Sequence, residues 1–150
     1  MPSLNPYLAF NGNCAEAFEF YKAVFGGELM MCRYKDMPAD TAGAFPVAEG
    51  DEQLVMHVSL PLGGGMVLMG CDMSKTCGTA TFGDSITLSI CPENEAEAKR
   101  IFSALAEGGK TTMPLEKVFW ADLFGMCVDK FGIPWMVNYE AEKKCSCCCE

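Results

Sequence analysis

The apolar residues between positions 13 and 27 recur at the spacing of one helix face. They are Cys14, Ala17, Phe18, Tyr21, Val24 and Phe25. Asn13 is placed to cap the helix start, and Glu16 stands three residues later, where it would complete a capping box. Gly26 and Gly27 can adopt the left-handed conformation that ends a helix. The pattern therefore predicts a helix that follows a short strand over residues 5–10.

A second copy of this pattern lies in the later half of the chain. A strand-like stretch over residues 86–90 precedes a helical stretch over residues 94–107, which also ends at a Gly-Gly pair. The two helical stretches align when Ala17 is set against Ala98, and their apolar positions then coincide. We interpret the repetition as a duplicated structural module.

Alternation of apolar and polar residues predicts three further strands in each half. They cover residues 28–34, 52–60 and 65–71 in the first half, and residues 110–113, 124–129 and 133–138 in the second. Residues 35–50 have the composition of a long loop, a kind that is often functional, and residues 72–84 that of a linker. Each half therefore follows the order β-α-β-β-β. We expect a single α+β domain over residues 1–144, made of modules 4–72 and 84–140.

One helix can cover only one face of a four-stranded sheet, so each module is left with an open face for a ligand or a partner. Two such modules could pair into a curved, barrel-like mixed sheet around a cavity, with the helices on the outside. The pairing could occur within one chain or between two chains. Exposed strand edges favour a homodimer.

The composition is that of an ordinary globular protein, with 50% hydrophobic and 21% charged residues. A formal net charge of −9 argues against nucleic acid or an anionic membrane as the main partner. No apolar run is long enough to span a membrane, and the N-terminus lacks the pattern of a signal peptide. We therefore expect a cytoplasmic protein without membrane or nucleic-acid partners.

The ten cysteines do not form the pattern of a disulfide framework. Six are scattered singly, several of them in apolar segments where small reduced thiols are common. The other four lie in the tail over residues 145–150, after a polar stretch. A frayed tail with reactive thiols is the favoured interpretation. Capture of a soft metal ion by the tail is the alternative.

Short sequence motifs, called words below, are spread over residues 6–138. They are Pro6–Ala17, Phe20-Tyr21, Phe25–Gly27, Gly108–Lys110, Met113–Leu115, Phe119–Ala121, Phe124-Gly125 and Asp129–Asn138. Together these words resemble the PhnB-like group of the vicinal oxygen chelate superfamily, which includes glyoxalase I, the bleomycin- and fosfomycin-resistance proteins and the extradiol dioxygenases. The resemblance implies paired β-α-β-β-β modules and a homodimer. Members of the group often carry a 3-demethylubiquinone methyltransferase description, but the glycine-rich loop and ribose-binding acid of a nucleotide-type methyl donor site are missing from this sequence.

Catalytic members of the superfamily hold a divalent metal with four side chains, typically His, Gln and Glu, and the metal polarises a substrate with adjacent oxygens. The resemblance places these positions at Pro6 (or Tyr7 after a one-residue slip), Leu68, Ser85 and Met136. None of these residues is a strong ligand. We therefore expect neither the family's metal site nor another cofactor.

His57 is the only histidine and lies within an expected strand, where period 2 places Val55 and Ser59 on its face. A structural, hydrogen-bonded histidine is the simpler interpretation. The functional interpretation is an acid or base facing a cavity, because imidazole ordinarily changes its charge near neutral pH.

Trp120 and Trp135 are the other residues that stand out, because large aromatics fill cores but also line the mostly apolar pockets that bind small molecules. Trp135 shares its face with Val137. Three hypotheses follow, of which the first is a metal-independent protein that binds a small molecule in a cavity lined by Tyr7, His57, Trp120 and Trp135. The second is a lyase, isomerase or dioxygenase that uses a divalent metal through other ligands, and the third is a partner-binding dimer with a vestigial cavity.

Overall fold

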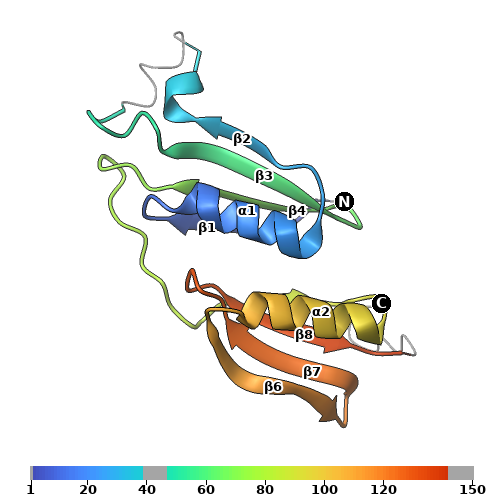
Figure 1. Cartoon of the computed structure of the whole chain (residues 1–150). Helices are drawn as coiled ribbons and strands as arrows, with labels where there is room; N and C mark the ends of the chain where they lie inside the picture. Colours follow the sequence, from blue (N-terminus) through green and yellow to red (C-terminus); the bar gives the residue numbers. More distant parts are fainter. Residues whose placement is uncertain (1, 39–46, 142–150) are drawn as a thin grey trace. The chain divides into compact units, whose positions relative to one another are not determined.

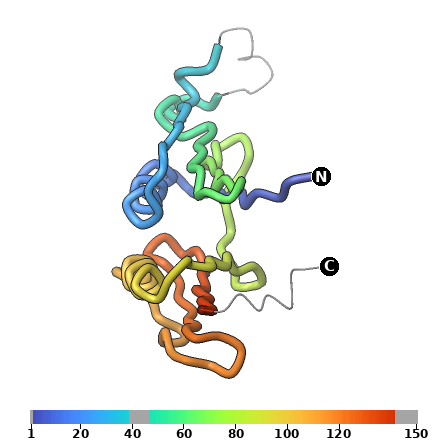
Figure 2. The backbone as a smooth tube through the Cα atoms, turned by 90° about the vertical axis from the view of Figure 1, so that its right-hand side faces the viewer, coloured from blue at the N-terminus to red at the C-terminus, as the bar shows by residue number. Residues whose placement is uncertain are grey.

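The computed structural model describes residues 2–38 and 47–141. Contacts within the chain divide it into residues 1–81, here called unit 1, and residues 82–150, called unit 2. Each unit holds one helix and one four-stranded sheet, and Figures 1 and 2 show the helix running along one face of its own sheet. The two units are described one at a time.

Unit 1 follows the predicted order of elements. They are β1 (Tyr7–Phe10), α1 (Cys14–Phe25), β2 (Met30–Arg33), a short 3-10 turn (Tyr34–Asp36), β3 (Val55–Gly63) and β4 (Met66–Asp72). The strands lie in the order β1-β4-β3-β2, called sheet 1. β1 runs parallel to β4, and the other neighbours are antiparallel.

Unit 2 repeats this arrangement. Its elements are β5 (Leu88–Ile90), α2 (Glu95–Ala106), β6 (Lys110–Val118), β7 (Ala121–Val128) and β8 (Pro134–Tyr139). The strand order of this sheet 2 is β5-β8-β7-β6, with β5 parallel to β8. The repeated order confirms the α+β class and the two β-α-β-β-β modules, while each sheet is curled and open rather than closed into a barrel.

The core of unit 1 lies between α1 and one face of sheet 1. Five of the six residues predicted to form the apolar helix face are buried, and Phe25 is partly exposed. The sheet contributes buried residues from three strands, including Phe10, Val58, Leu60 and Leu68. Gly70 belongs to this face, because a Cβ atom there would meet the Phe18 ring at 2.8 Å. The glycine lets the helix approach the sheet closely.

The core of unit 2 is built in the same way. α2 buries Ala98, Ile101, Phe102 and Leu105. Gly125 of β7 lies under Phe102, since a Cβ atom there would come within 2.8 Å of the ring. The direct cross-strand neighbour of Gly125 is Val137, and Trp135 follows on the same face. The prediction that Trp135 and Val137 share a face is confirmed.

The two helices start differently, and here one prediction is wrong. Asn13 makes no side-chain capping bond in unit 1. The carboxylate of Asp72, at the end of β4, instead accepts hydrogen bonds from the backbone N–H groups of Gly12 (2.8 Å) and Cys14 (3.0 Å). In unit 2, the Asn94 side chain accepts a bond from the Glu97 N–H. A local side chain caps α2, whereas a distant one holds the start of α1.

The strand boundaries differ from prediction mainly in unit 2. β6 extends to Val118, beyond the predicted end at Met113. The prediction was too short because the side chains of β6 are nearly all exposed, so its sequence lacks the alternation of apolar and polar residues that indicates a strand. The middle of the predicted loop 35–50 and the cysteine tail 145–150 lie outside the described residues. Within the described ranges, no helix is long and apolar enough to cross a membrane.

Candidate functional site

Sheet 1 has one face covered by α1 and one face without a helix, which we call the open face of sheet 1. Residues directly opposite one another on neighbouring strands point to the same side of a sheet. Gly70 faces α1, so its strand neighbours Met69 and Cys71 face the other way, together with their cross-strand partners. The open face therefore carries Tyr7, Ala9, Met30, Cys32, His57, Ser59, Met69 and Cys71.

Two of the predicted site residues meet on this face. The Tyr7 and His57 rings lie with their centroids 5.8 Å apart and are tilted by 35°. Tyr7 comes from the edge strand β1 and is 50% exposed, while His57 lies on β3 opposite Cys32. The pair presents two aromatic surfaces and two polar tips on a sheet face that no helix of unit 1 covers.

A thiol completes the group. A hydrogen bond joins the Tyr7 hydroxyl and the Cys71 sulfur, and burial followed by this bond raises the pKa of Tyr7 well above its ordinary value. Burial also raises the pKa of Cys71. Both groups therefore stay protonated at neutral pH, where they can donate hydrogen bonds. An uncharged thiol is a poor nucleophile, so this arrangement favours binding over covalent catalysis by Cys71.

Tyr34, at the end of β2, extends this polar group. Its hydroxyl forms a hydrogen bond with Ser74, although burial outweighs this bond and raises the Tyr34 pKa. Ser74 is itself buried and shares a 2.7 Å hydrogen bond with Thr76. Sequence reasoning missed both Tyr34 and Cys71. Strand parity could have indicated Cys71, because it follows Met69 by two residues on the same strand.

The two tryptophans belong to unit 2 and have different environments. Trp120 is 46% exposed at the turn between β6 and β7, and its ring packs edge-on against Phe124 at 5.2 Å. Trp135 is 1% exposed, and its indole N–H donates a 2.8 Å bond to Asp129. The side chain of Trp135 lies on the face covered by α2. Within its unit it therefore offers almost no surface to a ligand.

Asp129 organises the turn between β7 and β8. Its carboxylate also accepts bonds from the backbone N–H groups of Phe131 (2.8 Å) and Ile133 (3.0 Å). The side chain is buried, with 3% exposure. Asp129 thus joins the turn to Trp135. This structural role could not be predicted from the sequence motifs alone.

Two of the positions that the resemblance assigns to the superfamily's metal hold side chains that are poor ligands for it. Leu68 is fully buried on the helix-covered face of sheet 1, and the adjacent open-face residue is Met69. Met136 lies opposite Met126 in unit 2. Thioether and aliphatic groups cannot replace His, Gln or Glu for a hard divalent ion. Among the described residues, no three His, Cys, Asp or Glu side chains are grouped so as to hold a metal.

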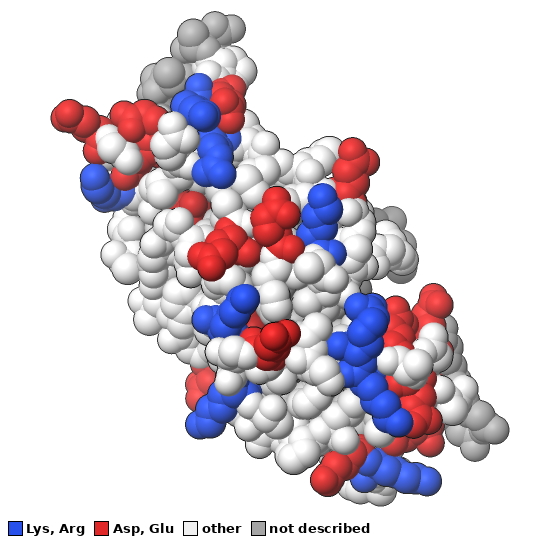
Figure 3. Space-filling model, viewed as in Figure 1, with Lys and Arg blue, Asp and Glu red and all other residues white. Residues whose placement is uncertain are grey.

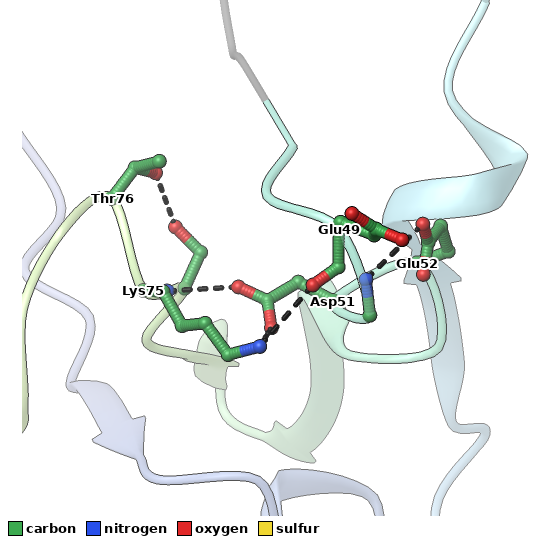
Figure 4. A network of polar contacts seen from close by, with 7 residues as sticks. Glu49, Asp51, Glu52, Lys75 and Thr76 are labelled. Atoms are coloured by element: carbon green, nitrogen blue, oxygen red, sulfur yellow. Dashed lines mark hydrogen bonds and ion pairs between the residues drawn. The ribbon is translucent and has the colours of Figure 1, made fainter.

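A cavity of about 440 Å³ lies at one end of sheet 1, between the β1–α1 connection and the segment after β4. Its lining includes Asn11, Asp51, Leu54, Met73 and Lys75. Figure 4 shows its charged rim, where the Lys75 Nζ lies 3.6 Å from the Asp51 carboxylate and donates to the Glu49 carbonyl. Because the cation is already paired with the buried carboxylate, we interpret this network as a support for the loops.

Charged side chains of both signs are mixed on one face of the molecule. Figure 3 shows acidic and basic side chains interspersed on the viewed face, without a separate basic patch. The excess of 20 acidic over 11 basic residues leaves the whole chain negative. A negative net charge is unfavourable for association with a nucleic-acid backbone.

The family of the chain follows from comparison with known proteins. Residues 2–138 match the family described as 3-demethylubiquinone-9 3-methyltransferase. The chain belongs to this family. It is 34% identical to the protein YjdN of Escherichia coli over 140 residues, which is 90% of this chain and 93% of YjdN. The predicted membership of the PhnB-like group is confirmed.

Two solved structures of related proteins have the same fold. The protein PA1353 from Pseudomonas aeruginosa is 38% identical with a TM-score of 0.79, and the match covers 93% of this chain and 98% of that one. A PhnB protein from Bacillus cereus, titled a putative 3-demethylubiquinone-9 3-methyltransferase, is 26% identical with a TM-score of 0.72, covering 92% and 99%. The family members share a fold over nearly their whole length.

Proposed function

We propose that this PhnB-like protein binds a small molecule without a metal ion, on the open face of sheet 1. The observation that carries the proposal is the meeting of Tyr7, His57 and Cys71 on that face. These groups supply two aromatic surfaces and several hydrogen-bonding atoms within one apolar setting. Pockets for small molecules have this composition, with a mostly apolar lining and a few placed polar groups.

The chemistry of the open face favours a ligand that carries little charge. The Tyr7 phenol and the Cys71 thiol are held in their neutral forms, and no Lys or Arg side chain belongs to the set of residues on this face. Met30 and Met69 add flexible, polarisable surface that adapts to ligand shape. An uncharged or weakly acidic organic molecule suits these groups better than a phosphate or a metal chelate.

We propose that the protein functions as a homodimer in the cytoplasm. Each unit leaves one sheet face without a helix, and association with a second copy would remove such surface from water. We propose Trp120, which is partly exposed, as a ligand-binding residue of unit 2. For Trp135 we propose an indirect part, since it fixes the turn at Asp129 beneath its own sheet.

A thermal-shift screen with small uncharged and acidic compounds tests this proposal. Compounds that stabilise the full chain are then measured against Tyr7→Phe, which keeps the ring but removes the hydroxyl, and against His57→Gln. Tyr139→Phe, on the last strand of unit 2, is the matched control. We expect the two open-face variants to weaken binding about tenfold, as loss of one hydrogen bond does, and the control to leave it unchanged.

The same screen is repeated after dialysis against a chelator and with added Zn²⁺, Ni²⁺, Mn²⁺ or Fe²⁺. Unchanged ligand binding is the expected result. Binding that disappears with chelation and returns with one metal would contradict the proposal and favour a metal-dependent lyase, isomerase or dioxygenase with other ligands. Failure of every compound to stabilise the protein would favour the partner-binding dimer.

A further inference from the structure

The cavity at one end of sheet 1 is separate from the open face of that sheet. It lies where β1 and β4 end and β3 begins, because Asn11, Met73 and Leu54 are the residues directly beyond those strand ends. None of its lining residues belongs to the open face. Its volume of about 440 Å³ is within the range of pockets that bind small molecules, roughly 300–1,000 Å³. The cavity is therefore large enough to be a binding site of its own.

Hydrogen bonds between distant segments fix the walls of this cavity. The Asn11 side chain donates a 3.0 Å bond to the Ala80 carbonyl and accepts a 2.8 Å bond from the Ala80 N–H. The Asp51 carboxylate accepts a 2.8 Å bond from the Lys75 backbone N–H. These bonds hold the segment after β4 against the β1–α1 connection and against the turn before β3. A ligand would enter a formed cavity and would not have to order its walls, which lowers the free-energy cost of binding.

The Lys75 ammonium supports the loops and still has unused hydrogen-bond donors. An ammonium group has three N–H donors. In the described part of the chain, the Lys75 Nζ donates one bond, at 3.2 Å to the Glu49 carbonyl. Its separation of 3.6 Å from the Asp51 carboxylate is longer than a hydrogen bond (Figure 4). Because the Lys75 side chain is 69% exposed, a ligand can reach a cation that the buried carboxylate holds in position.

The other lining residues add one polar group and an apolar surface. Thr79 carries a hydroxyl that makes no hydrogen bond to another described residue. Leu54 and Met73 are half-buried, and the methionine can adapt its shape to a ligand. A cation, a free hydroxyl and an apolar surface in one cavity match a molecule that has a carboxylate at one end and an apolar body.

We propose that this cavity binds a small monocarboxylic acid with an apolar body. The carboxylate bonds to the Lys75 ammonium and the Thr79 hydroxyl, and the apolar body contacts Leu54 and Met73. The site is additional to the one on the open face of sheet 1, where no cationic side chain is found. Asp51 has a double effect, because it positions the ammonium but its own negative charge opposes the carboxylate of the ligand.

The experiment uses two probes of the same shape, 4-phenylbutanoate and 4-phenylbutanamide, which differ in charge. Each is titrated into the full-length protein while the backbone amide signals of Gly78 and Thr79, which line the cavity, are followed by NMR. We expect the acid to bind about tenfold more tightly than the amide, since it forms a charge-assisted hydrogen bond with Lys75. Added NaCl should weaken the acid and leave the amide unchanged, because salt screens exposed charges.

Two substitutions should change the affinity for the acid in opposite directions. Lys75→Met keeps an unbranched side chain without the ammonium, and it should make the affinities for acid and amide equal. Asp51→Asn keeps an oxygen for the Lys75 backbone N–H but removes the negative charge. It should bind the acid about threefold more tightly, within the range of exposed charge pairs. Lys99→Met, on the exposed face of α2 in unit 2, is the matched control and should change neither affinity.

Equal affinities of the original protein for acid and amide would overturn the inference, as would a preference for the acid that survives in Lys75→Met. Signal changes confined to Tyr7, His57 and their neighbours would place the probe on the open face and overturn it as well. If Lys75→Met does not fold, Thr79→Val is titrated in its place and should weaken the acid more than the amide, while an unchanged preference would contradict the proposal. The proposed function is tested separately by Tyr7→Phe and His57→Gln, which lie outside the cavity.

Discussion

Units 1 and 2 have the same strand order and the same helix placement, but they fix the start of the helix by different means. In unit 1 the carboxylate of Asp72 reaches the first turn of α1 from the end of β4, and it also accepts a 3.0 Å bond from the Val55 N–H on β3. In unit 2 the cap is Asn94, the residue directly before α2. The start of α1 therefore depends on a formed sheet, whereas the start of α2 is encoded locally.

Each unit nevertheless contains one buried aspartate that accepts three hydrogen bonds from N–H groups. Asp72 joins a helix start to two strands, and Asp129 joins a hairpin turn to the Trp135 indole. A buried carboxylate therefore stabilises a different connection in each of the two units. A repeated fold can keep its strand order while the buried polar side chains that stabilise it occupy different positions.

The largest effect is expected from Asp72→Ala. The substitution leaves three backbone N–H groups without their acceptor, at the junction of α1, β3 and β4. We expect a loss of roughly 2–5 kcal/mol in the free energy of unfolding, because the Cys14 and Val55 N–H groups are buried and each unsatisfied buried donor costs about 1–3 kcal/mol. Urea unfolding followed by circular dichroism measures the loss. A loss below about 1 kcal/mol would show that the comparison overstates the role of Asp72.

Asp129→Ala should have the next largest effect, roughly 2–4 kcal/mol, because two backbone donors and the Trp135 indole lose their acceptor. Trp135→Phe is the matched variant, since it removes one of these bonds and keeps an aromatic ring. It should cost less than Asp129→Ala in the same urea experiment. If Trp135→Phe costs more, the packing of the indole outweighs the carboxylate in stabilising the turn.

Alkaline pH should weaken unit 1 more than unit 2. Burial raises the pKa of Cys14, Cys71 and Tyr7 in unit 1, and that of Cys127 in unit 2 from 9.0 to about 11. A group whose pKa is raised on folding stays protonated when the unfolded chain has already lost its proton, so stability falls as pH rises above the unfolded pKa. For Cys127 this window runs from about pH 9 to about pH 11.

The measurement is backbone hydrogen exchange by NMR between pH 8 and pH 10, corrected for the intrinsic exchange rate at each pH. Amides of β4 and α1 should lose more protection than those of β7 and α2. Cys127→Ala is the control, because it should remove the alkaline loss from unit 2 only. Parallel losses in both units would contradict the assignment of most raised groups to unit 1.

The smallest effects concern the helix caps themselves. Asn94→Ala should cost about 1 kcal/mol, which is typical for loss of an N-cap side chain. Asn13→Ala should cost less than about 0.5 kcal/mol, because Asn13 makes no capping bond. The pair is compared by urea unfolding under identical conditions. Equal losses would mean that Asn13 caps α1 in solution and that Asp72 is not its replacement.

Most of the fold could be predicted from the repetition and the periodicity of the sequence. The apolar helix faces and the β-α-β-β-β order are properties of local pattern, and both were predicted from it. The cap at Asn13 was wrong because the true acceptor, Asp72, is 58 residues away from Cys14, beyond the reach of any local pattern. The length of β6 was missed because an edge strand with two exposed faces shows no alternation.

The candidate site could be predicted only in part for a similar reason. Tyr7 and His57 stood out by residue type, and the structure brings their rings together across β1 and β3. Cys71 was one of several scattered cysteines until the register placed it beside Tyr7.

The placement of the two tryptophans has an optical consequence. Both lie in unit 2, one partly exposed and one 1% exposed, while unit 1 contains none. Intrinsic fluorescence excited at the red edge of the indole band therefore reports on unit 2 alone. Trp120 should emit at longer wavelength and be quenched by iodide, whereas Trp135 should emit at shorter wavelength and be shielded. The two tryptophans therefore report on two environments within unit 2, and unit 1 contributes no tryptophan emission.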